Sequence, residues 1–536
     1  MTHGDAPQAR ASTRAHWRYV MVGLGAAAYL YPFLRVLWRV GDEGTLVYGA
    51  QRVAEGAVPY RDFMEVMGPG TFCWLGLFFK IFGATWFVAR AELLLTGVAT
   101  TLALYWLTRR LHPGSGWLTA ILLTAITFPL WPATSHHWDS NLFALLAFAA
   151  FAAWLDNSRS WLGVAAGILA GVTTLFMQQK GVLLLFSFLL ILYLLRRKQP
   201  DFTPSVTRLL SGYVGVLLAM ILTFYAAGAL PQVVYANFTW PLTNYSSVNA
   251  VPYGYGLREW FWNAWCGLLL ALFRPAVAYG VASAFALPFL VVAALPAILL
   301  ALAVAGRTDA CNRVTLPYWV AGSALWISEI HRSDITHLIY GSPLLLILCI
   351  SLWQQRENRF WRYGARVLTV SVVLFAAFNF LVAQAARTRI VTRRGAVYAF
   401  ADDAALEFLD HQTEPGEEVF VYPYYPMYYF LSGTANPTRF SILLYHNNTD
   451  AQFQEVIAAL ERRKVRYVLW DTLVDGQNLK QWFPDYQQPP REKLTIEPYL
   501  NAHYDLIGVK NGFRVLQRKD TMVTRRAQPK AGPPGL

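Results

Sequence analysis

Charged residues are scarce in this chain. Asp, Glu, Lys and Arg make up only 14% of its 536 residues, hydrophobic residues make up 55%, and the mean hydropathy is +0.33. A soluble chain of this length needs a more polar surface to stay in solution, so the composition indicates a membrane protein with many spans. The net charge of +13 lies in short clusters between apolar runs, which is typical of membrane topology and not of a nucleic-acid surface.

The chain also has few cysteines and lacks the common nucleotide-binding motifs. Its four cysteines show no spacing typical of a disulfide framework or a zinc site. A P-loop, GxSxG, HExxH or dinucleotide-binding GxGxxG motif in a suitable context is missing. Soluble nucleotide chemistry is therefore not indicated. No internal repeat supports an inverted-repeat transporter.

Long apolar runs predict about eleven membrane helices, because a helix needs about 20 apolar residues to cross a bilayer. A polar, basic tail at 1–18 precedes the first run, and no cleavage site follows that run, so we expect it to be retained. Two shorter runs, 71–83 and 257–273, are expected to lie in the membrane interface as amphipathic helices. The expected spans are 19–38, 88–108, 117–133, 140–155, 161–176, 181–195, 209–227, 276–305, 315–330, 337–353 and 367–386.

Lys and Arg are concentrated in alternate connections between these spans, and basic connections are retained on the cytoplasmic side. The N-terminus is therefore expected to be cytoplasmic, in a multi-pass protein of the cytoplasmic, or inner, membrane. The acidic, imidazole-rich and aromatic clusters all fall on the opposite side. This sorting predicts one shared site at the outer membrane–water boundary.

Residues 388–520 show a different pattern, in which helical segments alternate with β-rich runs. The pattern predicts a C-terminal extracytoplasmic α/β domain attached to an α-helical polytopic membrane protein. The aromatic run 421–430 is either core of that domain or a surface for sugar or lipid, and core is the favoured interpretation. The tail 521–536 is predicted to be disordered. The β-rich runs are 419–424, 440–445, 466–471 and 513–518.

The first external segment, 39–87, carries five carboxylates and several fixed turns within 39–70. Connections between membrane helices are usually short, so this concentration favours a catalytic loop. Adjacent residues do not face the same point, and we assign general-base chemistry to Asp42 and an orienting or metal-related role to Glu43. Alternatively, Asp42 caps the helix that follows it. Arg61 and Asp62 are candidate substrate contacts.

Three external turns, SHHWDSN, MQQKG and EIHRSDITH, concentrate polar side chains between helices. Imidazoles and carboxylates can bind a metal or hold a sugar hydroxyl, and lysine and arginine suit a phosphate. A helix start at Asp139 and a snorkelling Lys180 stay open as structural alternatives. Arg258 lies in a long aromatic segment, 228–275, that either contacts substrate or anchors the protein in the interface. The candidate residues in the three turns are His136, His137, Asp139, Gln179, Lys180, Arg332, Asp334 and His337.

Three consecutive runs resemble the GT-C membrane glycosyltransferases. They are GDEGTLVYGAQRVAEGAVPYRDF, then GPGTFCWLGLFFKIFG, then the Arg-led helix VARAELLLTGVATTLALYWLTRRL. They are most similar to the bacterial branch with the lipid A aminoarabinose transferases, which are relatives of the protein O-mannosyltransferases. The resemblance covers 19–387 and implies a transmembrane catalytic domain. It further implies transfer of a hexose or pentose from a polyprenyl-phosphate donor to a lipid, glycan or protein acceptor on the outer face, usually with inversion at the anomeric carbon.

The resemblance also implies roles for individual residues. Asp42 corresponds to the loop aspartate that activates the acceptor, and Lys80 matches a basic residue near the donor phosphate. Looser matches imply roles for Asp139, Lys180, Arg332 and Asp334. Some members use a divalent metal and others do not, and the sequence has no ligand set that decides between the two, so the metal stays unknown.

Two other functions compete with the enzyme. A transporter or flippase for a lipid-linked sugar would use similar polar groups, but it should carry ionisable residues in the middle of its spans. The predicted spans here are nearly free of charge, which favours the enzyme. A non-catalytic scaffold that displays the α/β domain would tolerate the loss of Asp42.

Overall fold

The structure is a computed structural model that describes residues 6–112, 116–196, 202–245, 247–306, 312–355, 359–474 and 476–520. The predicted disordered tail at 521–536 lies outside these residues. The first helix, α1 (Ala6–Leu34), begins within the predicted N-terminal tail at 1–18 and continues through most of the first predicted span.

The chain is mostly helical, as the sequence predicts. Within the described residues, six helices are long and apolar enough to cross a membrane. A seventh span is obtained if the bent pair α16 (Ile335–Gly341) and α17 (Pro343–Gln354), which meet at 73°, counts as one. The six helices are α4 (Trp86–Leu111), α6 (His136–Asn157), α8 (Gln178–Leu195), α9 (Phe202–Ala226), α13 (Pro275–Ala293) and α18 (Arg359–Ala385).

The sequence predicts about eleven spans, whereas six or seven helices of the described residues meet the length and composition of a span. Three of the other expected spans are also helical but short, with 12 to 17 residues in α5 (Gly116–Thr127), α7 (Ser160–Phe176) and α15 (Leu316–Ser328). The fourth, 19–38, falls on α1, which has 29 residues but is not among the six. The run 276–305 is divided after Ala293 into α13 and α14 (Leu295–Gly306), so one predicted span is two helices.

Small residues allow two helices of the bundle to pack closely. A Cβ atom at Gly167 of α7 would lie 2.0 Å from the backbone oxygen of Leu209 on α9, and one at Gly212 would lie 2.3 Å from the oxygen of Val164. Membrane helices associate through such close backbone packing, because in lipid there is no hydrophobic driving force that brings apolar side chains together. Larger residues at these glycines would separate α7 from α9.

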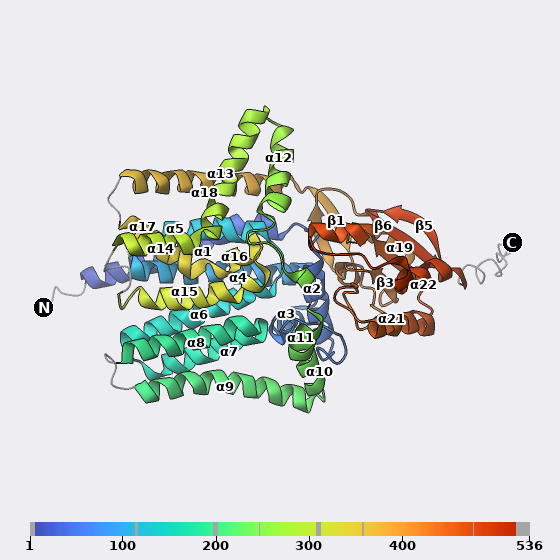
Figure 1. Cartoon of the computed structure of the whole chain (residues 1–536), viewed down its shortest axis with the longest axis horizontal. Helices are drawn as coiled ribbons and strands as arrows, with labels where there is room; N and C mark the ends of the chain where they lie inside the picture. Colours follow the sequence, from blue (N-terminus) through green and yellow to red (C-terminus); the bar gives the residue numbers. More distant parts are fainter. Residues whose placement is uncertain are drawn as a thin grey trace.

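A layer of short helices lies between the bundle and the C-terminal domain (Figure 1). It contains α2 (Gly41–Ala54), α3 (Pro69–Phe82), α10 (Leu230–Val234) and α11 (Trp240–Asn244). The first external segment is therefore largely two helices. Asp42 does not cap α2, because the N-cap residue is Val40 and Asp42 lies inside the first turn. A carboxylate in that position is favoured by the helix dipole.

The C-terminal domain is a mixed α/β unit, as predicted, at the end of the molecule opposite the N-terminus (Figure 1). Its sheet has the strand order β3-β4-β6-β5, in which β3 and β4 are parallel and the other pairs are antiparallel. A hairpin of β1 (Thr388–Thr392) and β2 (Gly395–Ala399) leads into it. The sheet strands are β3 (Val419–Tyr422), β4 (Tyr467–Asp471), β5 (Tyr504–Lys510) and β6 (Phe513–Arg518), with helices α19 (Ala404–Gln412), α20 (Met427–Ser432), α21 (Asp450–Arg463) and α22 (Ile496–His503).

Three of the four predicted β-rich runs contain strands, and the run 440–445 does not. Its first residue, Phe440, instead forms an isolated bridge with Met64 of the first external segment, and Met64 N donates to Arg439 O at 2.8 Å. The backbone there is used to dock the domain. A sequence pattern reports that a segment favours extended backbone, but it does not report which partner the segment pairs with.

The domain and the layer of short helices share one apolar core. Phe79 of α3 and Phe430 of α20 stack with ring centroids 5.7 Å apart. A Cβ atom at Gly44 of α2 would lie 2.2 Å from Met427 N of α20, so only glycine lets the two helices approach this closely. The C-terminal domain is therefore fixed directly against the start of α2, where Asp42 lies.

Candidate functional site

The Asp42 side chain is exposed at the N-terminal end of α2, and the hydroxyl group of Tyr424 donates a hydrogen bond to its carboxylate. The Tyr424 ring packs on Gly41, where a Cβ atom would lie 2.6 Å from the ring. The two glycines of the Gly41–Gly44 turn thus let the C-terminal domain reach Asp42. Tyr424 was not among the residues predicted for the site, because its run was interpreted as core of the β domain.

Glu43 points into the protein, away from the exposed side of Asp42. Its carboxylate is completely buried, lies 2.6 Å from Nη1 of Arg90 on α4, and accepts from the backbone N–H of Thr134 at 2.8 Å. Its partners are thus a buried guanidinium and a backbone amide, which leave it no open side for substrate. These contacts hold α2 on α4, and the orienting or metal-related role predicted for Glu43 from sequence stays a prediction.

A tyrosine connects Asp42 with the turn EIHRSDITH. Burial raises the pKa of Tyr245, Arg332 lowers it, and the carboxylates of Asp334 and Asp42 raise it further. Tyr245 therefore lies within electrostatic range of both Asp42 and the Arg332–Asp334 pair, although these groups come from separate segments of the chain.

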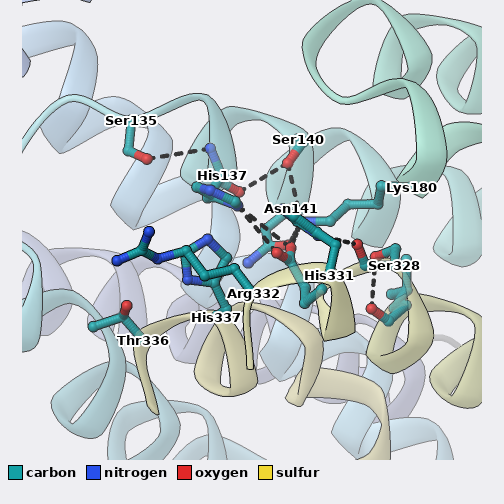
Figure 2. A network of polar contacts seen from close by, with 12 residues as sticks. Ser135, His137, Ser140, Asn141, Lys180, Ser328, His331, Arg332, Thr336 and His337 are labelled. Atoms are coloured by element: carbon teal, nitrogen blue, oxygen red, sulfur yellow. Dashed lines mark hydrogen bonds and ion pairs between the residues drawn. The ribbon is translucent and has the colours of Figure 1, made fainter. Parts of the chain in front are cut away.

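Lys180 lies inside the protein in a network of polar contacts (Figure 2). Its Nζ atom lies 2.6 Å from Oε1 of Glu329, 2.7 Å from Oδ1 of Asn141 and 3.0 Å from Oγ of Ser140. An ammonium group has three donors, and all three are used here. Lys180 is thus not a snorkelling lysine, since it is buried and neutralises Glu329; its predicted contact with a phosphate stays a prediction.

Two histidines adjoin the same glutamate. His137 Nδ1 lies 3.3 Å from Oε2 of Glu329, and the His137 ring stacks on Tyr340 with centroids 4.4 Å apart. His337 Nδ1 lies 2.8 Å from Oδ1 of Asp334, which also caps α16 through the backbone N–H of His337 at 3.1 Å. One potential ligand atom from each of His137, Glu329 and His337 lies within 4.8 Å of the other two.

Arg332 joins this cluster to the C-terminal domain. Its Nε donates to Asp334 at 2.9 Å and its Nη2 donates to the backbone oxygen of Trp482 at 2.9 Å. The guanidinium also lies 5.0 Å from the ring centroid of Phe483. Its side chain keeps 14% of its surface exposed, so part of the cation faces open space.

Asp139 and His136 come from the same turn as His137 but have different surroundings. The Asp139 carboxyl is buried against the Glu92 carboxyl and the hydroxyls of Thr71 and Thr96, on α3 and α4. The ring centroids of His136 and His137 are 4.1 Å apart. The structure therefore brings the predicted His136 and His137 together and separates Asp139 from their cluster.

The remaining predicted residues lie at the periphery. Lys80 is exposed and its Nζ is 3.4 Å from the oxygen of Ala54, at the C-terminal end of α2. With a rise of about 1.5 Å per residue, that end is about 18 Å from Asp42. Gln179 is exposed. Arg258 lies on the π-helical turn η5 (Leu257–Trp262).

Arg61 and Asp62 pair with each other at 2.8 Å on the surface. Arg61 also donates to the oxygen of Ala227, which ties the first external segment to the end of α9. A nearby groove of about 380 Å³ lies between this segment, the α10 region and the C-terminal domain, and Tyr60, Gln232 and Arg439 are among the residues that line it.

Glu65 is a buried carboxyl of the first external segment that sequence reasoning left without a role. Burial raises its pKa to about 8; Ser441 and Arg52 oppose the rise, and Asp42 adds to it. Its Oε1 atom has no hydrogen-bond partner among the described residues. At neutral pH the group is therefore largely protonated and uncharged, close to the Asp42 carboxylate.

Glu65 predicts a pH dependence of stability. Because its folded pKa is about 8 and lies above the unfolded value near 4.5, the unfolded chain binds fewer protons between these values, and stability falls as pH rises through the window. The expected slope is about 1.4 kcal/mol per pH unit for this one group. Melting temperatures from pH 5 to 8 should fall more steeply in the wild type than in Glu65→Gln, and equal slopes would contradict the assignment.

The fold is similar to that of a solved glycosyltransferase. The structure matches "ArnT from Cupriavidus metallidurans bound to Undecaprenyl phosphate" with a TM-score of 0.53 and 13% sequence identity, over 93% of this chain and 97% of that chain. The apo state of the same protein matches with a TM-score of 0.53 and 13% identity over 94% and 98%. The oligosaccharyltransferase AglB from Archaeoglobus fulgidus, in complex with an inhibitory peptide and a dolichol-phosphate, matches with a TM-score of 0.48 and 13% identity over 88% and 71%.

No protein-family model and no curated protein sequence matches the chain. The likeness to ArnT extends over nearly the whole length of both chains, so it defines the fold, including the C-terminal α/β domain. The chain is a multi-pass membrane protein with a GT-C glycosyltransferase fold, as the resemblance in the first external segment predicted.

Proposed function

We propose that the protein is a membrane glycosyltransferase that moves a sugar from a polyprenyl-phosphate donor to a lipid, glycan or protein acceptor on the outer face of the cytoplasmic membrane. One observation carries the proposal: within the fold of ArnT, the exposed Asp42 carboxylate at the start of α2 is held by the Tyr424 hydroxyl and lies within electrostatic range of the same tyrosine, Tyr245, as the Arg332–Asp334 pair. The ArnT structure holds undecaprenyl phosphate, which supports a polyprenyl phosphate as the ligand here.

In the proposed reaction, Asp42 accepts the proton of the acceptor hydroxyl group as its oxygen attacks the anomeric carbon of the sugar. The bond between that carbon and the donor phosphate oxygen breaks, and the electron pair leaves with the phosphate as polyprenyl phosphate. General bases contribute about 10²- to 10⁴-fold in such steps. Attack from the face opposite the phosphate inverts the configuration of the anomeric carbon.

Arg332 is the proposed phosphate contact, because its guanidinium is partly exposed beside the histidines and can form paired hydrogen bonds with phosphate oxygens. His136, His137 and His337 are proposed contacts for sugar hydroxyls or phosphate, positioned by Glu329 and Asp334. Lys80, Arg258, Arg61, Asp62 and Gln179 stay proposals as outer contacts with the donor, the acceptor or the bilayer surface.

The proposed orientation places the N-terminus in the cytoplasm and the α/β domain outside, because Lys and Arg are concentrated on one side of the predicted spans. The groove beside the first external segment is then a route for the acceptor. Its aromatic and amide lining suits a sugar-bearing molecule, and no nucleic-acid contact is expected.

The direct test is an assay of sugar transfer with the purified protein. Synthetic polyprenyl-phosphate donors with labelled sugars are mixed with a membrane extract, and labelled products are separated by class. Label in a lipid, glycan or protein fraction supports the transferase and identifies the acceptor. If no label is transferred and the protein instead moves the intact donor across liposomes, the flippase is the correct function.

Tyr424→Phe is expected to lower kcat by about tenfold or more, because a hydrogen bond to a charged group is worth about 1.5–3 kcal/mol. The variant keeps the ring that packs on Gly41 and removes only the hydroxyl that donates to Asp42. Steady-state kinetics with the same donor and acceptor test this. Unchanged kcat would show that the C-terminal domain does not act on Asp42.

A further inference from the structure

Three side chains from separate segments present metal-ligating atoms to one another inside the cluster. His137 lies at the start of α6, Glu329 at the end of α15, and His337 on α16. One ligand atom of each lies within 4.8 Å of the others. This convergence is not a feature of neighbouring residues, because His137 and Glu329 are far apart in the sequence.

The contact between His137 and Glu329 is long for a hydrogen bond. His137 Nδ1 lies 3.4 Å from Oε1 and 3.3 Å from Oε2, whereas an N–H···O bond is about 2.9 Å long. Oε2 has no hydrogen-bond partner among the described residues, although Glu329 is completely buried. Ligand atoms about 2.0–2.1 Å from one tetrahedral ion are separated by about 3.3 Å, which is the spacing of the His137–Glu329 pair, and the ligand atom of His337 lies within 4.8 Å of both.

His337 is held as a metal-binding histidine is usually held. Its Nδ1 lies 2.8 Å from Asp334, so Nδ1 donates to the carboxylate and the other ring nitrogen keeps a free lone pair. A carboxylate behind a histidine fixes its ring and strengthens it as a ligand. Asp334 is in turn fixed by Arg332 and by the backbone of α16.

The charges of the cluster indicate what completes the site. Lys180 neutralises Glu329 and Arg332 neutralises Asp334, so the four charges sum to zero before any ion binds. A buried divalent cation needs a compensating anion. An anionic fourth ligand, such as a phosphate oxygen, meets that need and occupies the position that three protein ligands leave open.

We propose that His137, Glu329 and His337 bind one divalent transition-metal ion, with Zn²⁺ as the best match, and that a phosphate group strengthens this binding. Two imidazoles and one carboxylate favour Zn²⁺ and similar ions over Mg²⁺, which prefers oxygen ligands. This inference goes beyond the proposed function and does not depend on it, because the metal is measured directly.

The test is metal binding by the full-length protein, purified without a polyhistidine tag and stripped with a chelator. We expect about one Zn²⁺ per chain after dialysis and a visible absorption band with Co²⁺ in its place. His137→Ala and His337→Ala should each weaken binding at least tenfold, and Asp334→Asn should weaken it about 10- to 100-fold. His331→Ala is the matched control, since its Nδ1 lies 3.2 Å from the oxygen of Ser328 and it belongs to no ligand set among the described residues.

Two results on the wild type need no variant. Zn²⁺ should raise the melting temperature in proportion to the logarithm of its concentration, because it binds only the folded state. Inorganic phosphate should tighten Co²⁺ binding, and Co²⁺ should tighten phosphate binding by the same factor. The inference is overturned if the wild type retains no stoichiometric metal, or if His331→Ala reduces binding as much as His137→Ala and His337→Ala do.

Discussion

Glu43→Gln is expected to lower the free energy of unfolding by about 3–5 kcal/mol, the range measured when one partner of a buried ion pair is removed. The Arg90 guanidinium would be left buried without its counter-charge, since its partner oxygen is 2.6 Å away and Glu43 is completely buried. The Thr134 N–H would also lose a charged acceptor. Thermal unfolding of the purified protein in detergent measures the change.

The matched control is Asp62→Asn, which removes a carboxylate of the same segment from a surface pair with Arg61. Exposed pairs contribute about 0–1 kcal/mol, so this variant should unfold near the wild-type temperature. If Glu43→Gln instead keeps the wild-type stability and loses transfer activity, the orienting or metal-related role predicted for Glu43 from sequence is correct and the structural role is wrong.

Asp42→Asn is expected to lower kcat for sugar transfer by about 10²- to 10⁴-fold, because an amide cannot accept the proton of the acceptor hydroxyl group. The amide oxygen still accepts the hydrogen bond of Tyr424, so the contact between α2 and the C-terminal domain is kept. Binding of a polyprenyl phosphate and the melting temperature should stay close to the wild-type values. The measurement is single-turnover transfer with saturating donor.

Asp505→Asn is the control for this experiment, since Asp505 is an exposed carboxylate on β5 of the sheet. It should keep full activity. Transfer by Asp42→Asn at the wild-type rate would remove Asp42 from the mechanism, and an equal loss in both variants would point to a general effect of charge.

The sequence predicted the helices better than it predicted the contacts between them. Apolar runs marked the long helices of the bundle because a span needs a continuous apolar surface, and the β-rich runs marked β3, β4 and β6. The same reasoning could not divide 276–305 into α13 and α14, since the residues on both sides of Ala294 are equally apolar.

Some contacts of the site have no signal in one sequence. The Lys180–Glu329 and Arg90–Glu43 pairs join residues far apart in the chain. A lysine at a helix end has the same sequence pattern whether its side chain faces lipid or protein. Tyr424 lies in an aromatic run that also forms core, so the contact of its hydroxyl group with Asp42 could not be predicted from the sequence. The glycines of Gly41–Gly44 were a usable signal, since paired glycines mark a close approach.

The central claim is that the sugar leaves its carrier during the reaction, and the most direct test follows the carrier. The purified protein is given a polyprenyl-phosphate sugar and an acceptor-containing extract, and released polyprenyl phosphate and transferred sugar are counted by mass spectrometry. We expect one polyprenyl phosphate to be released per sugar transferred, with both lost in Asp42→Asn. A carrier that keeps its sugar while crossing the liposome membrane would contradict the central claim.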